Sequence, residues 1–496
     1  MPSLPLKLSP DAATSDVGAA LAALRTELGL PDAFPPEVLA EAEAAVAAYE
    51  LPDLDLTAIP FITIDPAGAT DLDQALAIET DGEGWRLWYA IADLPGFVEP
   101  GGAIDAEARL RGQTFYAADG RIPLHPPVIS EGAASLLPNE ERGAFVWEFR
   151  LDATGRATST TVTRARMRSV RQLSYDEAQT AVDSDRMLGL LREVGERRIT
   201  IESERGGASL ATPEILVTRD GDDYRLERRI TLPVEAWNAQ LSLLTGMEAA
   251  RMMLDGGVGI LRTMPPAEPT AIEKFRRQTI ALGTPWRADE HYGDYLRRLS
   301  ADDPRHIAIR HAAASLFRGA AYRAFDGEPP EETVQAAISA PYAHVTAPLR
   351  RLVDRFGLEV CVALSAGVAV PEWVRAGLPE LPSLMGRSTN MSGQLDRRTL
   401  AIVEAAVLAP HVGEVFDAIA ITDSTVQLAE PAVEASCAGE LRPGTEVRVR
   451  LTQADIPSGS VAFELARRPR PRSRPRAGRG AAPRGRSRSL PVSRTR

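Results

Sequence analysis

The sequence predicts an α+β protein, in which a large domain with a mixed sheet and helices precedes a small OB-like β-barrel and a disordered basic tail. Three patterns support this prediction. From Ile59 to about residue 174, short runs rich in β-branched and aromatic residues stand between Gly and Pro residues and predict strands. Over much of 175–410, apolar residues repeat every three and four positions, which predicts helices. From Val412 the strand pattern returns, and about 55 residues of short strands suit a small barrel.

Residues 1–57 are expected to form a short helical region. Asp16 is placed to cap VGAALAALRTEL, and Pro35-Pro36 opens EVLAEAEAAVAAY, where proline is tolerated in the first helical turn. The region is rich in alanine and has no strand pattern, so we do not expect a β-barrel there.

Residues 58–410 are expected to form the one large domain, because a strand-rich half is followed by a helical half. Its predicted strands are PFITIDP, ALAIE, WRLWYAIAD and a hairpin formed by AFVWEFRLD and TSTTVTRARMRS. Its clearest predicted helices are AWNAQLSLLTGMEAARMML, IAIRHAAASLFRGAAYRAF and DRRTLAIVEAAVLA.

Residues 411–466 are expected to form the small barrel, from EVFDAIAIT, TVQLAE, TEVRVRLTQA and SVAFEL. They lack an aromatic-rich strand, so either a degenerate RNA-binding barrel or a purely structural cap is expected. Residues 467–496 hold 12 arginines, no acid and almost no apolar residue, which predicts disorder. This tail is either a salt-sensitive phosphate tether or an extension without a role.

Composition excludes several classes of protein. No apolar run is long enough for a membrane span, and no basic start followed by an apolar stretch suggests a secretory signal. The only cysteines, Cys361 and Cys437, are far apart, which argues against a disulfide framework and a thiolate zinc site and favours a cytoplasmic location. No GxxxxGK[ST] loop is present, so no nucleotide cofactor is expected. The net charge of −12 argues against a nucleic-acid partner. This charge is unevenly placed, because the 12 arginines make the tail positive and leave −24 on the remaining residues.

The segment IDPAGATDLDQAL carries the clearest candidate site. Asp71 and Asp73 are two residues apart, so on an extended chain both carboxylates point to the same side, and the turn at Pro66 can bring Asp65 toward them. Carboxylate oxygens suit Mg²⁺ or Mn²⁺, and such an ion can activate water against a phosphate. A solvated turn is the more common outcome for such spacing. A calcium-stabilised structural module is a further alternative, although the full calcium-loop spacing is missing.

Longer blocks around this segment resemble the RNB catalytic domain of the ribonuclease II and ribonuclease R family. They occur in order: TIDPAGATDLDQAL, YAIADLPGFVEPGGAIDAEARLRGQTFY, IPLHPPVISEGAASLLPNEER and YAHVTAPLRRLVDRF. The resemblance covers most of 58–410 and implies hydrolytic removal of nucleotides from an RNA 3′ end with magnesium. Family members commonly carry RNA-binding barrels on both sides of this domain, and residues 1–57 are too short for two of them.

The resemblance also implies roles for individual residues. Asp65, Asp71 and Asp73 match three of the family's four active-site aspartates, so they are expected to hold metal, with Asp73 catalytic. Tyr116 matches an aromatic residue that stacks on the terminal base. Arg350 matches an arginine that contacts the scissile phosphate, and Arg351 is its basic neighbour in RNA binding.

The sequence departs from the family pattern at two positions. Gln74 stands where the fourth aspartate falls; it brings no negative charge, so at least one metal ion should be held more weakly. Val258 falls near a second base-stacking aromatic, which leaves one aromatic face for the terminal base. Asp396 is a further, loosely aligned acidic candidate.

The resemblance therefore implies a metal-dependent 3′-to-5′ exoribonuclease that degrades single-stranded RNA to nucleoside 5′-monophosphates. The alternative is a catalytically weakened or inactive RNA-binding protein that keeps the fold, and Gln74 motivates it. We expect a monomer that uses Mg²⁺, or Mn²⁺ in its place.

Overall fold

A computed structural model describes residues 16–466 except 32, 118–119, 209–213, 221–222, 230, 301–302, 314–315, 429–430 and 432. The predicted α+β class is confirmed, and the strands of the large domain close into a barrel in the order β1-β2-β3-β6-β7. Neighbouring strands are antiparallel except β1 and β7, which run parallel. The strands are β1 (Phe61–Asp65), β2 (Gln74–Asp81), β3 (Gly84–Ala92), β6 (Glu141–Leu151) and β7 (Ala157–Ser174).

Both faces of β1, β3 and the middle parts of β2 and β6 are buried, so these segments are nearly continuous apolar runs, whereas β7 is mostly polar and partly exposed. Alternate side chains point to opposite faces of a strand, so each strand divides its apolar residues between two clusters. The first cluster includes Ile62, Ile64, Leu76, Ile78, Leu87, Tyr89, Ile91, Phe145, Trp147 and Phe149. The second includes Phe61, Ala75, Ala77, Trp88, Ala90, Ala144 and Val146.

Helices of the large domain pack on the first cluster, chiefly α5 (Arg186–Arg205), α6 (Pro233–Gly256) and α10 (Leu352–Ala366). Gly195 lets α5 approach α6 closely, because a Cβ at this position would lie 2.4 Å from the Cβ of Trp237. The remaining helices of this domain are α3 (Ala103–Arg111), α4 (Tyr175–Ala181), α7 (Pro269–Ala281), α8 (Tyr292–Arg297), α9 (Pro304–Ala313), α11 (Glu372–Gly377) and α12 (Leu381–Leu408).

Among the described residues, the large domain also contains four short antiparallel strand pairs. They are β4 (Phe115–Ala117) with β5 (Gly120–Ile122), β8 (Glu214–Asp220) with β9 (Asp223–Arg229), β10 (Val258–Thr263) with β11 (Ala321–Asp326), and β12 (Val334–Gln335) with β13 (Ala340–Pro341). One prediction is wrong here: IAIRHAAASLFRGAAYRAF is not one helix, because α9 ends at Ala313 and the segment continues into β11. Pairing with β10 along six residues overrides the local helical spacing.

Two helices precede the barrel, α1 (Asp16–Glu27) and α2 (Pro36–Ala48), as the sequence predicts. Both are tied to the large domain. Val17, Leu21 and Leu24 of α1 share a hydrophobic cluster with α12. Glu41 of α2 accepts the backbone N–H groups of Ala103 (2.6 Å) and Ile104 (3.2 Å), and so caps the first turn of α3.

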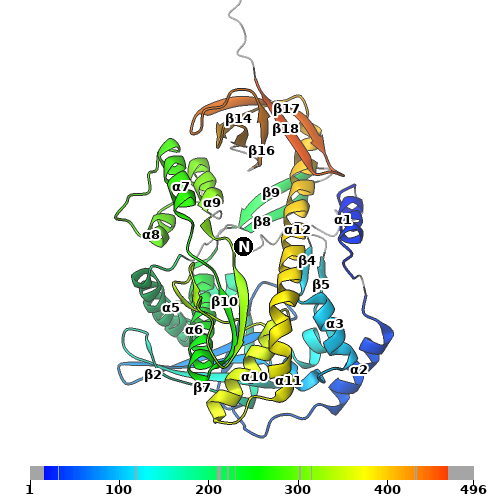
Figure 1. Ribbon diagram of the computed structural model, residues 1–496, viewed down its shortest axis with the longest axis vertical. Helices are drawn as coiled ribbons and strands as arrows, with labels where there is room; N and C mark the ends of the chain where they lie inside the picture. The colour runs from blue at the N-terminus through cyan, green and yellow to red at the C-terminus, as the bar shows by residue number, and fades with distance from the viewer. Residues whose placement is uncertain are drawn as a thin grey trace, which may run out of the picture. The chain divides into compact units, whose positions relative to one another are not determined.

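The C-terminal strands form a second closed barrel in the order β14-β15-β16-β18-β17. They are β14 (Val415–Ala420), β15 (Thr425–Leu428), β16 (Glu434–Ala438), β17 (Glu446–Asp455) and β18 (Ser460–Leu465). The sequence pattern missed β16, whose burial pattern has a single fully buried residue, Cys437. The long helix α12 contacts β17 and β18 (Figure 1). Its Leu408 belongs to the core of this barrel.

None of the described helices is long and apolar enough to cross a membrane. The disorder predicted for 467–496 falls on residues that lie outside the described part of the chain.

Glu404 on α12 makes stability depend on pH. Its side chain is half-buried, and burial together with repulsion by Glu434 raises the pKa of its carboxyl to about 8. The folded state therefore holds this proton more tightly than the unfolded state, where glutamate titrates near 4.3. The contribution to stability is fully present below about pH 4.3 and is lost as the pH rises through about 8.

We expect Glu404→Gln to raise Tm relative to wild type by roughly 2 °C at pH 9 and by less at pH 5. Glu273→Gln removes the same charge from an exposed position and is the matched control. Thermal unfolding at both pH values measures the difference. A gain that is equal at pH 5 and pH 9 would contradict the assignment.

Candidate active site

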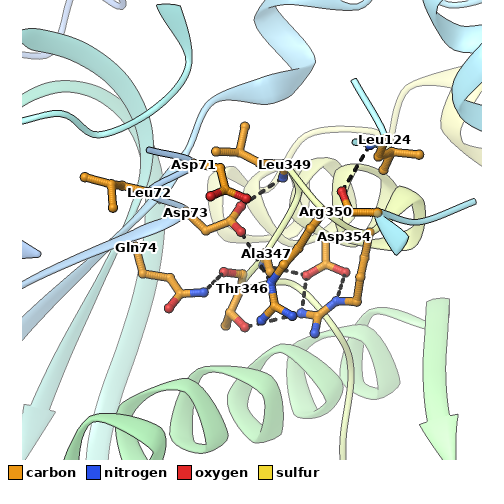
Figure 2. A network of polar contacts seen from close by, with 12 residues as sticks. Asp71, Leu72, Asp73, Gln74, Leu124, Thr346, Ala347, Leu349, Arg350 and Asp354 are labelled. Carbon is orange, nitrogen blue, oxygen red and sulfur yellow. Dashed lines mark hydrogen bonds and ion pairs between the residues drawn. The ribbon is translucent and has the colours of Figure 1, made fainter. Parts of the chain in front are cut away.

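The aspartates lie on the connection from β1 to β2. Asp65 is the last residue of β1, and Gln74 is the first residue of β2. Between them, the buried Leu72 is held by two backbone contacts: its N–H donates to Ser135 Oγ (2.9 Å), and its carbonyl accepts the N–H of Leu136 (3.0 Å). Because alternate residues of an extended chain face opposite ways, Asp71 and Asp73 point away from the Leu72 side chain, as Figure 2 shows.

Asp73 is the most deeply buried of the three aspartates, with 4% of its surface exposed. Its Oδ1 accepts the backbone N–H of Leu349 (2.9 Å), and its Oδ2 lies 3.6 Å from Nε of Arg350. Burial raises the pKa of its carboxyl to about 8, against the charge of Arg350. The predicted partners Asp73 and Arg350 are therefore in contact.

The carboxyl of Asp65 also has a raised pKa. Burial and repulsion from Asp71 raise the pKa of its carboxyl to about 7, and Arg350 opposes this shift. Asp71 and Arg350 therefore both act electrostatically on Asp65, although Arg350 lies 285 positions further along the chain. A cation near Asp65 and Asp73 would relieve the cost of holding two buried negative charges.

The two neighbouring arginines differ in what they can reach. The Arg350 side chain is 42% exposed, whereas that of Arg351 is 17% exposed. Asp354, which is fully buried, accepts Nε (2.8 Å) and Nη2 (2.7 Å) of Arg351 as well as the N–H of Ala347 (2.7 Å). This carboxylate thus ties the segment that carries Arg350 to α10 (Figure 2). No sequence pattern indicated a role for Asp354, since an isolated aspartate in a helix is usually solvated.

Gln74 uses both ends of its amide within the fold. Its Nε2 donates to the carbonyl oxygen of Thr346 (2.5 Å), and its Oε1 accepts the hydroxyl of Tyr89 (3.3 Å). A carboxylate at this position has no hydrogen to donate to the Thr346 carbonyl. Gln74 therefore links β2 to the segment that carries Arg350.

Tyr116 belongs to β4, and its side chain is exposed at 41%. Loss of water around its hydroxyl raises the pKa to about 12, and the charges that act on it are those of Arg350, Asp71, Asp73 and Arg121. The structure therefore brings this predicted residue to the aspartates. Val258 opens β10 in the core, with 2% of its surface exposed.

Arg121 is a member of the site that sequence reasoning missed. Its guanidinium forms an ion pair with Asp71 and lies 2.8 Å from the Glu131 carboxylate. Arginine is so common in this chain that no pattern set this one apart.

Asp396 lies on α12, where burial raises the pKa of its carboxyl to about 6. Within the described residues, no hydrogen bond or ion pair joins it to the three aspartates of the site.

The donors at this site suit a hard cation. Asp65 offers partly buried carboxylate oxygens and Asp73 fully buried ones, and Mg²⁺ and Mn²⁺ prefer this type of ligand, while Asp71 is engaged by Arg121. Across the described part of the chain, no three His, Cys, Asp or Glu side chains converge closely enough to form a complete ligand set. Water or substrate oxygens would therefore have to supply the remaining ligands.

Comparison with known proteins agrees with this arrangement. Residues 54–356 match the RNB domain, and residues 414–466 match the C-terminal S1 domain of RNase II-type exonucleases. Ribonuclease R of Escherichia coli is 29% identical over 358 residues, which cover 67% of this chain and 43% of that protein. The chain spans 37 to 43% of the length of three curated relatives that it matches.

Two solved structures share the fold. The apo form of Mycoplasma genitalium RNase R superposes with a TM-score of 0.80 at 17% identity, covering 91% of this chain and 78% of that one. Yeast Ssd1, described as a pseudonuclease, superposes with a TM-score of 0.64 at 15% identity, covering 89% of this chain and 56% of that one. Since the RNB match spans more than half of the chain and the S1 match follows it, the chain belongs to the RNB family of ribonuclease II and ribonuclease R proteins.

Proposed function

We propose that this chain is a metal-dependent exoribonuclease that hydrolyses single-stranded RNA from its 3′ end and releases nucleoside 5′-monophosphates. The observation that carries the proposal is the contact between buried Asp73 and half-exposed Arg350, beside Asp65 and Tyr116. This set combines carboxylates for a cation, an exposed guanidinium for a phosphate and an aromatic ring for a base. The relatives named ribonuclease R support the same reading.

Each residue then has a separate task. The planar guanidinium of Arg350 can donate to two phosphate oxygens and stays charged at any working pH. The ring of Tyr116 can stack on the terminal base, a contact worth about 1–3 kcal/mol. Asp65 and Asp73 would hold Mg²⁺ or Mn²⁺, with Asp71 beside them. When bound, such a cation lowers the pKa of a water molecule and stabilises charge on the phosphate.

Arg351 is better suited to positioning than to RNA contact. Asp354 occupies two of its donors, and most of its side chain is covered. In this proposal Arg351 holds the segment before α10, and Arg350 alone contacts the scissile phosphate. Both cysteines are buried and unpaired, which supports activity in a reducing cytoplasm.

A second candidate is an RNA-binding protein that keeps the fold without efficient cleavage. Gln74 favours it, because the amide is neutral and is already bound to Thr346 and Tyr89. The fold shared with a pseudonuclease is compatible with it.

RNA carrying a 5′ label distinguishes the two candidates. We expect wild type with Mg²⁺ or Mn²⁺ to shorten the RNA progressively from the 3′ end and to stop when the metal is chelated. Asp73→Asn should lower kcat by about 100-fold or more, because a neutral amide holds the divalent cation more weakly than a carboxylate, while RNA binding persists. Binding without cleavage by wild type in both metals would establish the second candidate. Equal rates for wild type and Asp73→Asn would identify a contaminant.

The roles of the two arginines separate by substitution. Arg350→Ala should lower kcat by about 10²–10³-fold, since it removes a donor aimed at the developing charge. Arg156→Ala, on an exposed arginine paired with Glu204, is the control and should leave kcat unchanged. Single-turnover kinetics measure the chemical step. A loss confined to KM would contradict the assignment of Arg350 to the transition state.

Removing Asp354 should destabilise the fold as well as the site. Asp354→Ala leaves the covered guanidinium of Arg351 and the N–H of Ala347 without their acceptor, at an expected cost of about 3 kcal/mol in the free energy of unfolding. Urea denaturation measures this change. The double variant Asp354→Ala with Arg351→Met should recover part of it, and no recovery would mean that the charge is not the cause.

A further inference from the structure

The β4–β5 hairpin has one face in the core and the other toward the aspartates. Phe115 and Ile122 lie directly opposite each other in its register, and both join the hydrophobic cluster formed by α1 and α12. The next opposed pair along the hairpin is Tyr116 and Arg121. Opposed residues share a face, and successive residues alternate faces. Tyr116 and Arg121 therefore project together from the face that the cluster leaves open.

Arg121 connects this face to the aspartate loop. Its guanidinium forms an ion pair with Asp71, donates to Thr70 Oγ1 (2.8 Å), and lies 2.8 Å from Glu131 Oε2. Thr70 Oγ1 in turn donates to the same glutamate oxygen (3.0 Å). These contacts are only partly exposed: 28% of the Arg121 side chain and 17% of the Asp71 side chain are accessible. The geometry of three partners restrains the guanidinium far more than one surface ion pair would.

The charge at the site gives this contact a second consequence. Gln74 contributes no negative charge to the site, and Arg121 holds a positive charge next to the Asp71 carboxylate. A divalent cation that approaches Asp71 must displace the guanidinium or share the carboxylate with it. Both outcomes weaken cation binding at Asp71. Displacement of the guanidinium would also release the hairpin that carries Tyr116.

We propose that Arg121 is a positioning residue, which acts as the built-in counter-ion of Asp71 and thereby holds Tyr116 beside the aspartates. This proposal deepens the proposed function and rests on it. The contact between Arg121 and Asp71 has two consequences. Asp71 binds metal weakly, and the ring of Tyr116 is held beside the aspartates.

Cation binding tests the first property without any RNA. Titration of the full chain with Mn²⁺, followed by electron paramagnetic resonance, gives the dissociation constant directly. We expect Arg121→Ala to tighten it by about tenfold, since a charge-assisted contact no longer competes. Arg121→Lys keeps the charge and should stay within twofold of wild type. Arg156→Ala removes an arginine from an exposed pair and should also leave the constant unchanged. An unchanged constant in Arg121→Ala would overturn the counter-ion role.

Steady-state kinetics on single-stranded RNA test the second property. Arg121→Ala should raise KM more than it lowers kcat, because a base contact is lost and Arg350 is retained. Tyr116→Ala should do the same. If Arg121 acts through Tyr116, the double variant should have a KM within twofold of Tyr116→Ala alone. Additive effects on KM would overturn the link between the two residues.

Folding and function can be separated in this design. Circular dichroism melts check each variant, and Arg121→Gln replaces Arg121→Ala if the alanine variant is not folded. Should wild type bind RNA without cleaving it, the proposed function fails, and RNA affinity replaces KM in the double-variant comparison. If wild type is active while Arg121→Ala and Arg121→Gln leave both the Mn²⁺ constant and KM unchanged, only the inference about Arg121 fails.

Discussion

The site depends on one contact between distant parts of the chain. Leu349 donates its backbone N–H to Asp73 across 276 residues of sequence, and Arg350 follows directly beside the same carboxylate. This contact joins the aspartate loop to the segment before α10. Gln74 and Asp354 reinforce it from either side, the first through the Thr346 carbonyl and the second through Ala347. All of these bonds are short-ranged, so small displacements of either segment would separate them.

The barrel makes that contact possible. Alternate side chains of its strands pack into two different apolar clusters, so a shift of one residue would move each side chain into the wrong cluster. The ends of β1 and β2 are therefore held in place, and Asp65 and Gln74 with them. The helices α1 and α12 give similar support to the β4–β5 hairpin, through the cluster that includes Phe115 and Ile122.

Burial also decides which charged groups are available for chemistry. Arg351 and Asp354 neutralise each other in a covered position, so they stabilise the segment before α10. Asp65 and Asp73 have no such complete neutralisation, and burial raises the pKa of both carboxyls. A divalent cation that binds these two carboxylates would stabilise their charged forms and so offset the cost of burying them.

The sequence by itself determined the α+β class, the two N-terminal helices and most strands of both barrels, because periodicity of two or about 3.6 residues is a local property. It also singled out Asp65, Asp71, Asp73, Tyr116 and Arg350 through motif blocks. Only the tertiary structure decided that Gln74 binds Thr346, that Asp354 holds Arg351, and that Arg121 reaches Asp71. It likewise turned 321–326 into a strand. These contacts depend on which distant segments come together when the barrel closes. Residue spacing along the sequence does not specify which segments those are.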